Sequence, residues 1–80
     1  MAESDTPAEV VDCVGMQCPL PVIKIAQAIK GLDAGQLLEL LATDPGIEPD
    51  MHAWTRRTKN ELVGITKDGE VFHVLVRKAG

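Results

Sequence analysis

The stretch DCVGMQCPLPVIKIAQAIKG, residues 12–31, places two prolines directly in front of an apolar run with helical spacing. Proline breaks a helix interior, but the first four N–H groups of a helix have no partner inside it. Prolines in the first turn therefore lose no hydrogen bond. We predict a helix with Cys18 as N-cap, Pro19 and Pro21 at the first and third positions, and Gly31 at its end. Its apolar face is Val22, Ile25, Ala26, Ile29 and Leu32.

A sulfur atom at the start of this helix would face free N–H groups and the positive end of the helix dipole. An anionic sulfur is favoured in such a place. The dipole contributes only about 1 kcal/mol, so it lowers the pKa of a thiol modestly. No acid–base residue lies close to Cys18 in the sequence, and Lys24 is almost two turns away. This pattern indicates a moderately activated sulfur, useful as a persulfide, rather than a hydrolytic nucleophile.

Outside this helix, the turn-forming residues Gly, Pro and Asp mark where the other predicted elements begin and end. QLLELLA, residues 36–42, is seven residues long between Gly35 and Asp44-Pro45-Gly46, which favours a buried strand over a helix. A second helix begins at Pro45 or nearer Pro49 and runs to Lys59, with Asn60 as left-handed C-cap. The remaining strands are 8–13, 61–66 and 71–77, the last two joined by an Asp-Gly turn at 67–70.

The order strand, helix, strand, helix, strand, strand predicts an α+β fold. We expect a two-layer α/β sandwich, βαβαββ, with two helices packed on one face of a four-stranded mixed sheet. A chain of 80 residues is long enough for one small domain, placed at 8–80 after a flexible leader at 1–7. Trp54 and Phe72 are the only aromatic residues, so the core must be aliphatic.

Composition narrows the classes of function. The net charge of −4 argues against direct nucleic-acid binding through a basic face. Two cysteines do not form a disulfide framework, the first 12 residues lack a signal peptide, and no apolar run reaches the ~20 residues of a membrane span. We therefore expect a cytoplasmic protein with free thiols and no membrane contact.

The run VDCVGMQCPLP, residues 11–21, resembles the signature of the TusA-like (SirA/YeeD) sulfur carrier family. That signature is a Cys-Pro-x-Pro at the start of the first helix, preceded by an Asp-x-x-Gly turn. The similarity covers about residues 9–79 and includes Gly35, the Asp44-Pro45 step and the closing Arg77-Lys78. Asn60 departs from the pattern, because a glycine is expected between the second helix and the third strand.

The resemblance implies the same βαβαββ sandwich and a carrier role for Cys18. A cysteine desulfurase or a rhodanese-type sulfurtransferase would load sulfur on Cys18 as a persulfide. The chain would then pass this sulfur to a thiol of an acceptor protein, in tRNA thiolation, cofactor sulfuration or sulfur oxidation; a related branch is linked to selenium. Such a protein resembles a sulfurtransferase but carries sulfur rather than turning over independently. No metal or organic cofactor is expected.

The residues around the motif suggest where partners bind. We expect Pro19, Leu20 and Pro21 to form an exposed apolar rim that fixes the geometry of the sulfur and contacts partners. Basic residues offer further docking positions, although those of the second helix can equally be a solvated helix end favoured by the dipole. These docking candidates are Arg56, Arg57, Lys59, Arg77 and Lys78. We expect the carrier to act as a monomer.

Other roles of the cysteines remain open at this point. Cys13 is interpreted as a half-buried structural thiol, but a Cys13/Cys18 pair would also suit a thiol–disulfide redox protein. A non-catalytic regulatory interaction module is a third reading. The spacing of the two cysteines with His52 and His73 matches no compact zinc motif. We expect His52 on a helix surface and His73 on the exposed side of the sheet.

Overall fold

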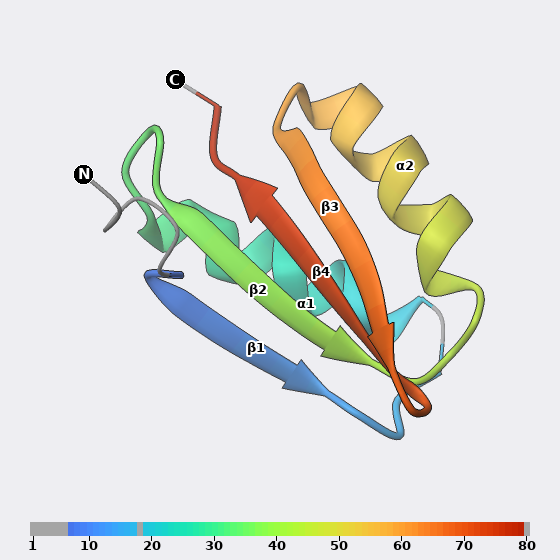
Figure 1. Cartoon of the computed structure of the whole chain (residues 1–80). Coiled ribbons are helices and arrows are strands. Elements are labelled where there is room, and N and C mark those ends of the chain that lie inside the picture. Colours follow the sequence, from blue (N-terminus) through green and yellow to red (C-terminus); the bar gives the residue numbers. More distant parts are fainter. Residues whose placement is uncertain (1–6, 18, 80) are drawn as a thin grey trace.

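Strands and helices alternate along the chain before it closes in a hairpin (Figure 1). The computed structural model describes residues 7–17 and 19–79. A short 3-10 turn, η2, extends the first helix. The elements are β1 (Glu9–Cys13), α1 (Leu20–Ala28), η2 (Ile29–Gly31), β2 (Leu37–Ala42), α2 (Ile47–Thr58), β3 (Glu61–Asp68) and β4 (Val71–Arg77). The predicted βαβαββ order is confirmed.

The four strands form one mixed sheet in the order β1-β2-β4-β3. Strands β1 and β2 are parallel, whereas β4 runs antiparallel to both β2 and β3. Both helices cover the same face of the sheet (Figure 1), so the predicted two-layer sandwich is confirmed. Because β1 and β2 are parallel, their last residues, Cys13 and Ala42, pair with each other. They mark one edge of the sheet, in the sense of a side along which strands end and not of an outer strand. The loops that lead into α1 and α2 therefore start side by side.

The core between the layers is aliphatic, as the composition predicts. Alternate residues of the two central strands point at the helices, which follows from the two-residue period of a strand. Each fully buried aliphatic side chain contributes about 1.5–3 kcal/mol. Trp54 and Phe72 are the two aromatic side chains in this otherwise non-aromatic core. The core cluster is Cys13 from β1, Leu38, Leu40 and Ala42 from β2, Phe72, Val74 and Val76 from β4, Ile25 from α1, Ile29 from η2, Leu32, and Ile47, Met51 and Trp54 from α2.

Helix α1 begins one residue later than predicted. Pro19 is the N-cap, with φ −100° and ψ 17°, so Leu20 is the first helical residue and Pro21 the second. The assignment of Cys18 as N-cap is therefore wrong, because the backbone of Pro19 is still outside the α-helical region. Pro21 loses no hydrogen bond at its position, which agrees with the physical reason for its presence.

Helix α2 begins at Ile47, between the two predicted starting points, with Gly46 as N-cap. Pro49 lies within the first turn and costs no hydrogen bond. At the other end Lys59, not Asn60, has the left-handed φ of 69°, so the predicted C-cap is wrong. Asn60 instead donates from Nδ2 to Thr58 Oγ1 at 2.9 Å and accepts at Oδ1 from the Ala79 N–H at 2.8 Å.

The hairpin is longer than predicted. Strand β3 extends to Asp68, which pairs with Val71, so the turn contains only Gly69 and Glu70. Gly69 has a φ of 63°, the value that the first position of a type II′ turn requires. A bulge between Leu62 and Gly64 shifts the register of β3 against β4.

Candidate functional site

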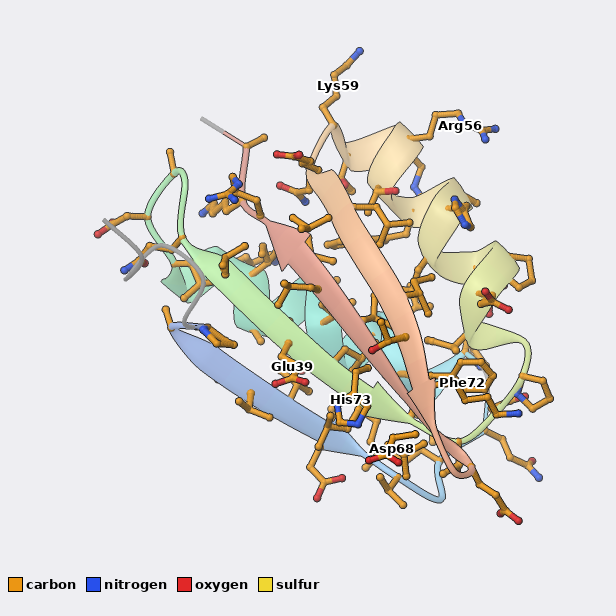
Figure 2. The ribbon with its side chains drawn as sticks, viewed as in Figure 1. Glu39, Arg56, Lys59, Asp68, Phe72 and His73 are labelled. Atoms are coloured by element: carbon orange, nitrogen blue, oxygen red, sulfur yellow. The ribbon has the colours of Figure 1, made fainter. Side chains whose placement is uncertain are left out.

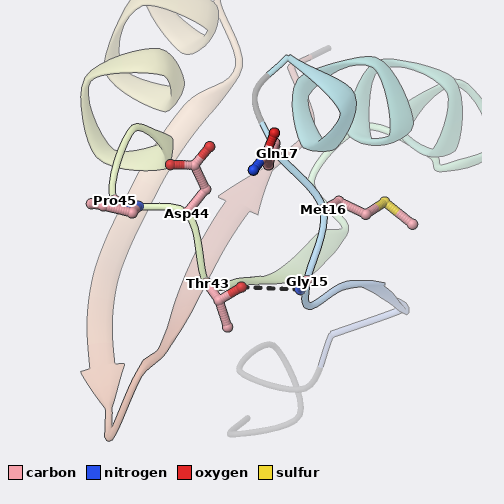
Figure 3. Close-up of a pocket in the computed structure, with 6 residues that line it drawn as sticks. All are labelled: Gly15, Met16, Gln17, Thr43, Asp44 and Pro45. Atoms are coloured by element: carbon pink, nitrogen blue, oxygen red, sulfur yellow. Dashed lines mark hydrogen bonds between the residues drawn. The ribbon is translucent and has the colours of Figure 1, made fainter.

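The loop between β1 and α1 is held from several sides. Within its first half, the Val14 N–H donates to Asp12 Oδ1 at 3.0 Å and the Met16 N–H donates to the Cys13 carbonyl at 3.1 Å. The Gly15 N–H crosses to the neighbouring loop and donates to Thr43 Oγ1 at 3.0 Å (Figure 3). These bonds fix the chain shortly before position 18.

Cys18, the predicted carrier residue, lies outside the described residues. Its two neighbours in the sequence, Gln17 and Pro19, are exposed. On the helix side, the Leu20 N–H donates to the Gln17 carbonyl at 2.9 Å. The chain is thus anchored both before and after position 18, at the edge of the sheet where α1 and α2 begin.

An open hollow of about 410 Å³ lies between the two loops at this edge. Figure 3 shows the Gln17 amide and the Asp44 carboxylate facing the space between the loops. Asp44 Oδ1 accepts a hydrogen bond from the Gly46 N–H at 3.0 Å, which orients this carboxylate. The lining residues are Gly15, Met16, Gln17, Thr43, Asp44 and Pro45. The hollow gives a reacting partner room beside the motif.

A second groove, of about 190 Å³, runs between α1 and α2. It brings Arg57, one of the predicted docking residues, to the same groove as Pro19. Val22, Ala53 and Trp54 give this groove an apolar part. The lining residues are Pro19, Val22, Asp50, Ala53, Trp54 and Arg57.

The rim predicted from the three residues after Cys18 is only partly exposed. Pro19 is exposed and Leu20 is 48 % exposed, as expected. Pro21 is fully buried, so its place in an exposed rim is wrong. The reason is helical phase, because Pro21 lies four residues before the buried Ile25 and shares its face. Ile23, one turn after Leu20, adds exposed apolar surface instead.

Fewer backbone donors are available to a sulfur atom than the sequence suggests. Pro19 and Pro21 have no N–H group. The Leu20 N–H is bonded to Gln17, and the Ile23 N–H donates to the Pro19 carbonyl at 3.1 Å. The N–H groups of Leu20 and Ile23 are therefore already engaged within the chain.

Cys13 is a core residue with no exposed surface, rather than the half-buried thiol expected. Burial raises the pKa of the Cys13 thiol above its ordinary value of 9.0, the nearby Lys24 ammonium lowers it and the Asp12 carboxylate raises it further. A buried and protonated thiol is a poor nucleophile. This environment disfavours the redox reading, in which Cys13 would attack a disulfide.

Two predicted docking residues, Arg77 and Lys78, lie at the opposite edge of the sheet, where Arg77 pairs with Leu37. Arg77 Nη1 donates to the Gly35 carbonyl at 3.1 Å, and Lys78 Nζ donates to the Leu32 carbonyl at 2.8 Å. Arg77 Nε also lies 3.3 Å from Glu61 Oε1. These contacts fix the end of the chain against the turn before β2.

Arg56 and Lys59 are exposed near the C-terminal end of α2 (Figure 2). That end points away from the edge that carries the hollow (Figure 1). The structure therefore separates the five basic candidates and brings only Arg57 into a groove with the motif.

Neither histidine lines the hollow or the groove. His73 Nδ1 lies 2.7 Å from Glu39 Oε2 on the face of the sheet without helices (Figure 2). His52 is exposed on α2. Among residues 7–17 and 19–79, no three His, Cys, Asp or Glu side chains form a group able to hold a metal ion. Within the same residues, no helix has the length and apolar character needed to cross a bilayer.

Thr43 is the functional candidate that the sequence does not single out. Its one signal is a polar residue placed directly after a buried strand and directly before the Asp44-Pro45 step. The partner of its hydroxyl is Gly15, which is 28 residues away. Only the parallel pairing of β1 and β2 brings these two residues together.

Comparison with known proteins gives consistent results. Residues 9–78 match the family model described as sulfurtransferase TusA. The putative sulfur carrier protein YrkF of Bacillus subtilis is 39 % identical over 71 residues, which are 89 % of this chain and 38 % of YrkF. The sulfur carrier protein TusA of Allochromatium vinosum is 36 % identical over 69 residues, which are 86 % of this chain and 91 % of that protein.

The fold also has a match among solved structures. A SirA-like protein from Desulfitobacterium hafniense superposes with a TM-score of 0.78 at 22 % identity, over 90 % of this chain and 99 % of that one. This likeness supports the sandwich architecture. The chain spans most of the Allochromatium protein but only 38 % of YrkF.

Proposed function

This chain belongs to the TusA family of sulfur carriers, and from that premise we propose that it carries sulfur as a persulfide on Cys18. The match over residues 9–78, which include the Cys-Pro-x-Pro sequence, is the observation that carries the proposal. The anchored loop on both sides of position 18 and the exposed Gln17 and Pro19 support it, because a carrier must present its cargo to other proteins.

The transfer is an exchange of sulfur between thiols. The Cys18 thiolate attacks the outer sulfur of a persulfide on the donor. The donor's S–S bond breaks, the donor's thiolate leaves with the bonding electron pair, and the transferred sulfur is now bound to Cys18. In the second half, a thiolate of the acceptor attacks this outer sulfur and the Cys18 thiolate leaves. The two steps balance without an external oxidant or reductant.

Members of a sulfur carrier family interact with donor and acceptor proteins. For this chain we take the donor to be a cysteine desulfurase or a rhodanese-type sulfurtransferase, and the acceptor to be a protein with a reactive thiol. The delivered sulfur would serve tRNA thiolation, cofactor sulfuration or sulfur oxidation in the cytoplasm. The carrier needs no metal or organic cofactor, since the cargo is bound covalently.

The proposal is tested by loading the purified protein from a cysteine desulfurase with cysteine, or from a rhodanese with thiosulfate. Intact-mass spectrometry should show the gain of one sulfur atom, which a reductant removes. Cys18→Ser should gain none, whereas Cys13→Ser should load like the wild type. A wild type that stays unmodified with both donors, or an adduct that persists in Cys18→Ser, overturns the proposal.

A further inference from the structure

The side chain of Thr43 ties the β1–α1 loop to the loop that follows β2. The Gly15 N–H donates to Thr43 Oγ1 at 3.0 Å across 28 residues of sequence (Figure 3). We propose that Thr43 is a positioning residue for sulfur transfer, which acts by fixing the loop that leads to Cys18. This inference rests on the proposed function.

Within residues 12–17, the other hydrogen bonds of this loop do not replace the Thr43 contact. Asp12 Oδ1 and the Cys13 carbonyl bind the N–H groups of Val14 and Met16, so they attach the loop to β1 alone. Gly15 has a φ of 85°, which glycine adopts without steric cost because it has no Cβ. For the same reason, glycine can leave this conformation easily. The bond to Thr43 is the contact that restrains this flexible position against a second strand.

Thr43 itself sits on a rigid base. It follows Ala42, which is fully buried and pairs with Cys13 on one side and Phe72 on the other. On its other side, the Ile47 N–H donates to the Asp44 carbonyl at 3.0 Å at the start of α2. A β-branched threonine also has few side-chain rotamers. The position of the Thr43 hydroxyl is therefore set by β2 and α2, independently of its hydrogen bond to Gly15.

Such preorganisation of the loop affects the rate of sulfur transfer and not the final extent of loading. Exchange at sulfur requires the thiolate to approach the donor's S–S bond in line, and small misplacements of reacting groups slow a reaction strongly. Without the Thr43 hydroxyl, the loop would sample more positions and present the cysteine correctly for less of the time. Loading would slow, and its end point would be unchanged.

Three variants separate positioning from general stability. Thr43→Val removes the hydroxyl at constant shape, and Thr43→Ser retains it. Thr58→Val is the matched control, because Thr58 Oγ1 also makes hydrogen bonds, to the Trp54 carbonyl at 2.8 Å and from Asn60 Nδ2 at 2.9 Å, at the far end of α2. Urea unfolding measures the stability of each variant, so that effects on rate are compared at known stability.

Three readouts follow the loop and the cysteine. Amide hydrogen exchange of Gly15 reports the bond itself, and should be about fivefold faster in Thr43→Val only. The rate of alkylation of Cys18 by iodoacetamide, mapped by peptide mass spectrometry from pH 6 to 9, should change its pH profile in Thr43→Val. Single-turnover loading from glutathione persulfide should slow about fivefold or more in Thr43→Val, and remain near the wild-type rate in Thr43→Ser and Thr58→Val.

Clear results would overturn the inference. One is a Gly15 N–H that exchanges as fast in the wild type as in an unstructured peptide. Another is a loading rate that falls equally in Thr43→Ser and Thr43→Val, or equally in Thr58→Val and Thr43→Val. If the wild type takes up no sulfur at all, the proposed function fails instead; Gly15 exchange and Cys18 alkylation still test the positioning role, which an unchanged alkylation profile in Thr43→Val would then contradict.

Discussion

At the residue scale, two cysteines five positions apart have different assigned roles. Cys13 closes β1 and packs in the core with no exposed surface. Cys18 lies outside the described residues, and its neighbours in the sequence, Gln17 and Pro19, are exposed. The sequence already distinguishes them, because Cys18 stands before Pro19 and Pro21 whereas Cys13 ends a predicted strand; the alternation along β1 then decides that Cys13 is buried. Cys13 pairs with Ala42 and faces the helices, because Val11 and Cys13 lie on the inner side of the strand.

Burial of Cys13 predicts a pH-dependent contribution to stability. Its pKa is raised in the folded state, so the unfolded chain loses this proton first, near the ordinary value of 9.0. The contribution is fully present below about pH 9 and is lost as the pH rises through and beyond it, by up to about 1.4 kcal/mol per pH unit. Urea unfolding from pH 7 to 10 should show the wild type losing more stability than Cys13→Ala. Parallel curves for both proteins would contradict the assignment.

At the element scale, local signals predicted most of the architecture. The helical spacing of apolar residues and the Pro-x-Pro start defined α1. Turn-forming residues on both sides of the short leucine-rich run identified β2, although leucine favours helices. One error came from a local pattern that the sequence contains, and one contact depends on geometry beyond any local pattern. Pro21 was grouped with its exposed neighbours, but its phase on α1 places it with Ile25. The Thr43–Gly15 bond joins two loops 28 residues apart, which no local pattern reports.

The C-terminal end of α2 offers an element-scale prediction. Lys59 is the one described non-glycine residue with a positive φ, at 69°, and a side chain costs roughly 1 kcal/mol in that conformation. Lys59→Gly should therefore raise the free energy of unfolding by about 0.5–1 kcal/mol. Lys59→Ala removes the same charge but keeps the strain, and is the matched control. Equal stabilities of the two variants would show that the left-handed conformation is not strained.

At the scale of the whole molecule, the two edges of the sheet have different tasks. One edge carries the hollow, the groove and the starts of both helices. At the other edge, Arg77 and Lys78 hold the chain end against the turn before β2. The sequence predicted the family and the motif, but it offered five basic residues alike as docking candidates, although they lie in different parts of the molecule. The placement of Arg77 and Lys78 depends on strand direction, because the end of β4 pairs with the start of β2 and so lies far from the end of β2.

The groove between α1 and α2 predicts unequal roles for two adjacent arginines. Both arginines are exposed near the end of α2, but only Arg57 lines the groove that includes Pro19 (Figure 2 labels Arg56). If a partner docks at the motif, Arg57→Glu should lower the second-order rate of loading from a persulfidated donor protein by about tenfold at low salt. Arg56→Glu carries the same charge change and should have less than about threefold effect. Equal losses in both variants would indicate bulk electrostatics instead of docking at the groove.

The central claim is that sulfur passes through Cys18 from one protein to another, and a two-step relay with isotopically labelled sulfur tests it most directly. The carrier is loaded from a labelled donor, separated from that donor, and mixed with an acceptor protein that has a reactive thiol. The account predicts that peptide mass spectrometry finds the label on Cys18 first, and then on the acceptor as Cys18 returns to the free thiol. Label that remains on the carrier, or that appears on Cys13, would contradict it.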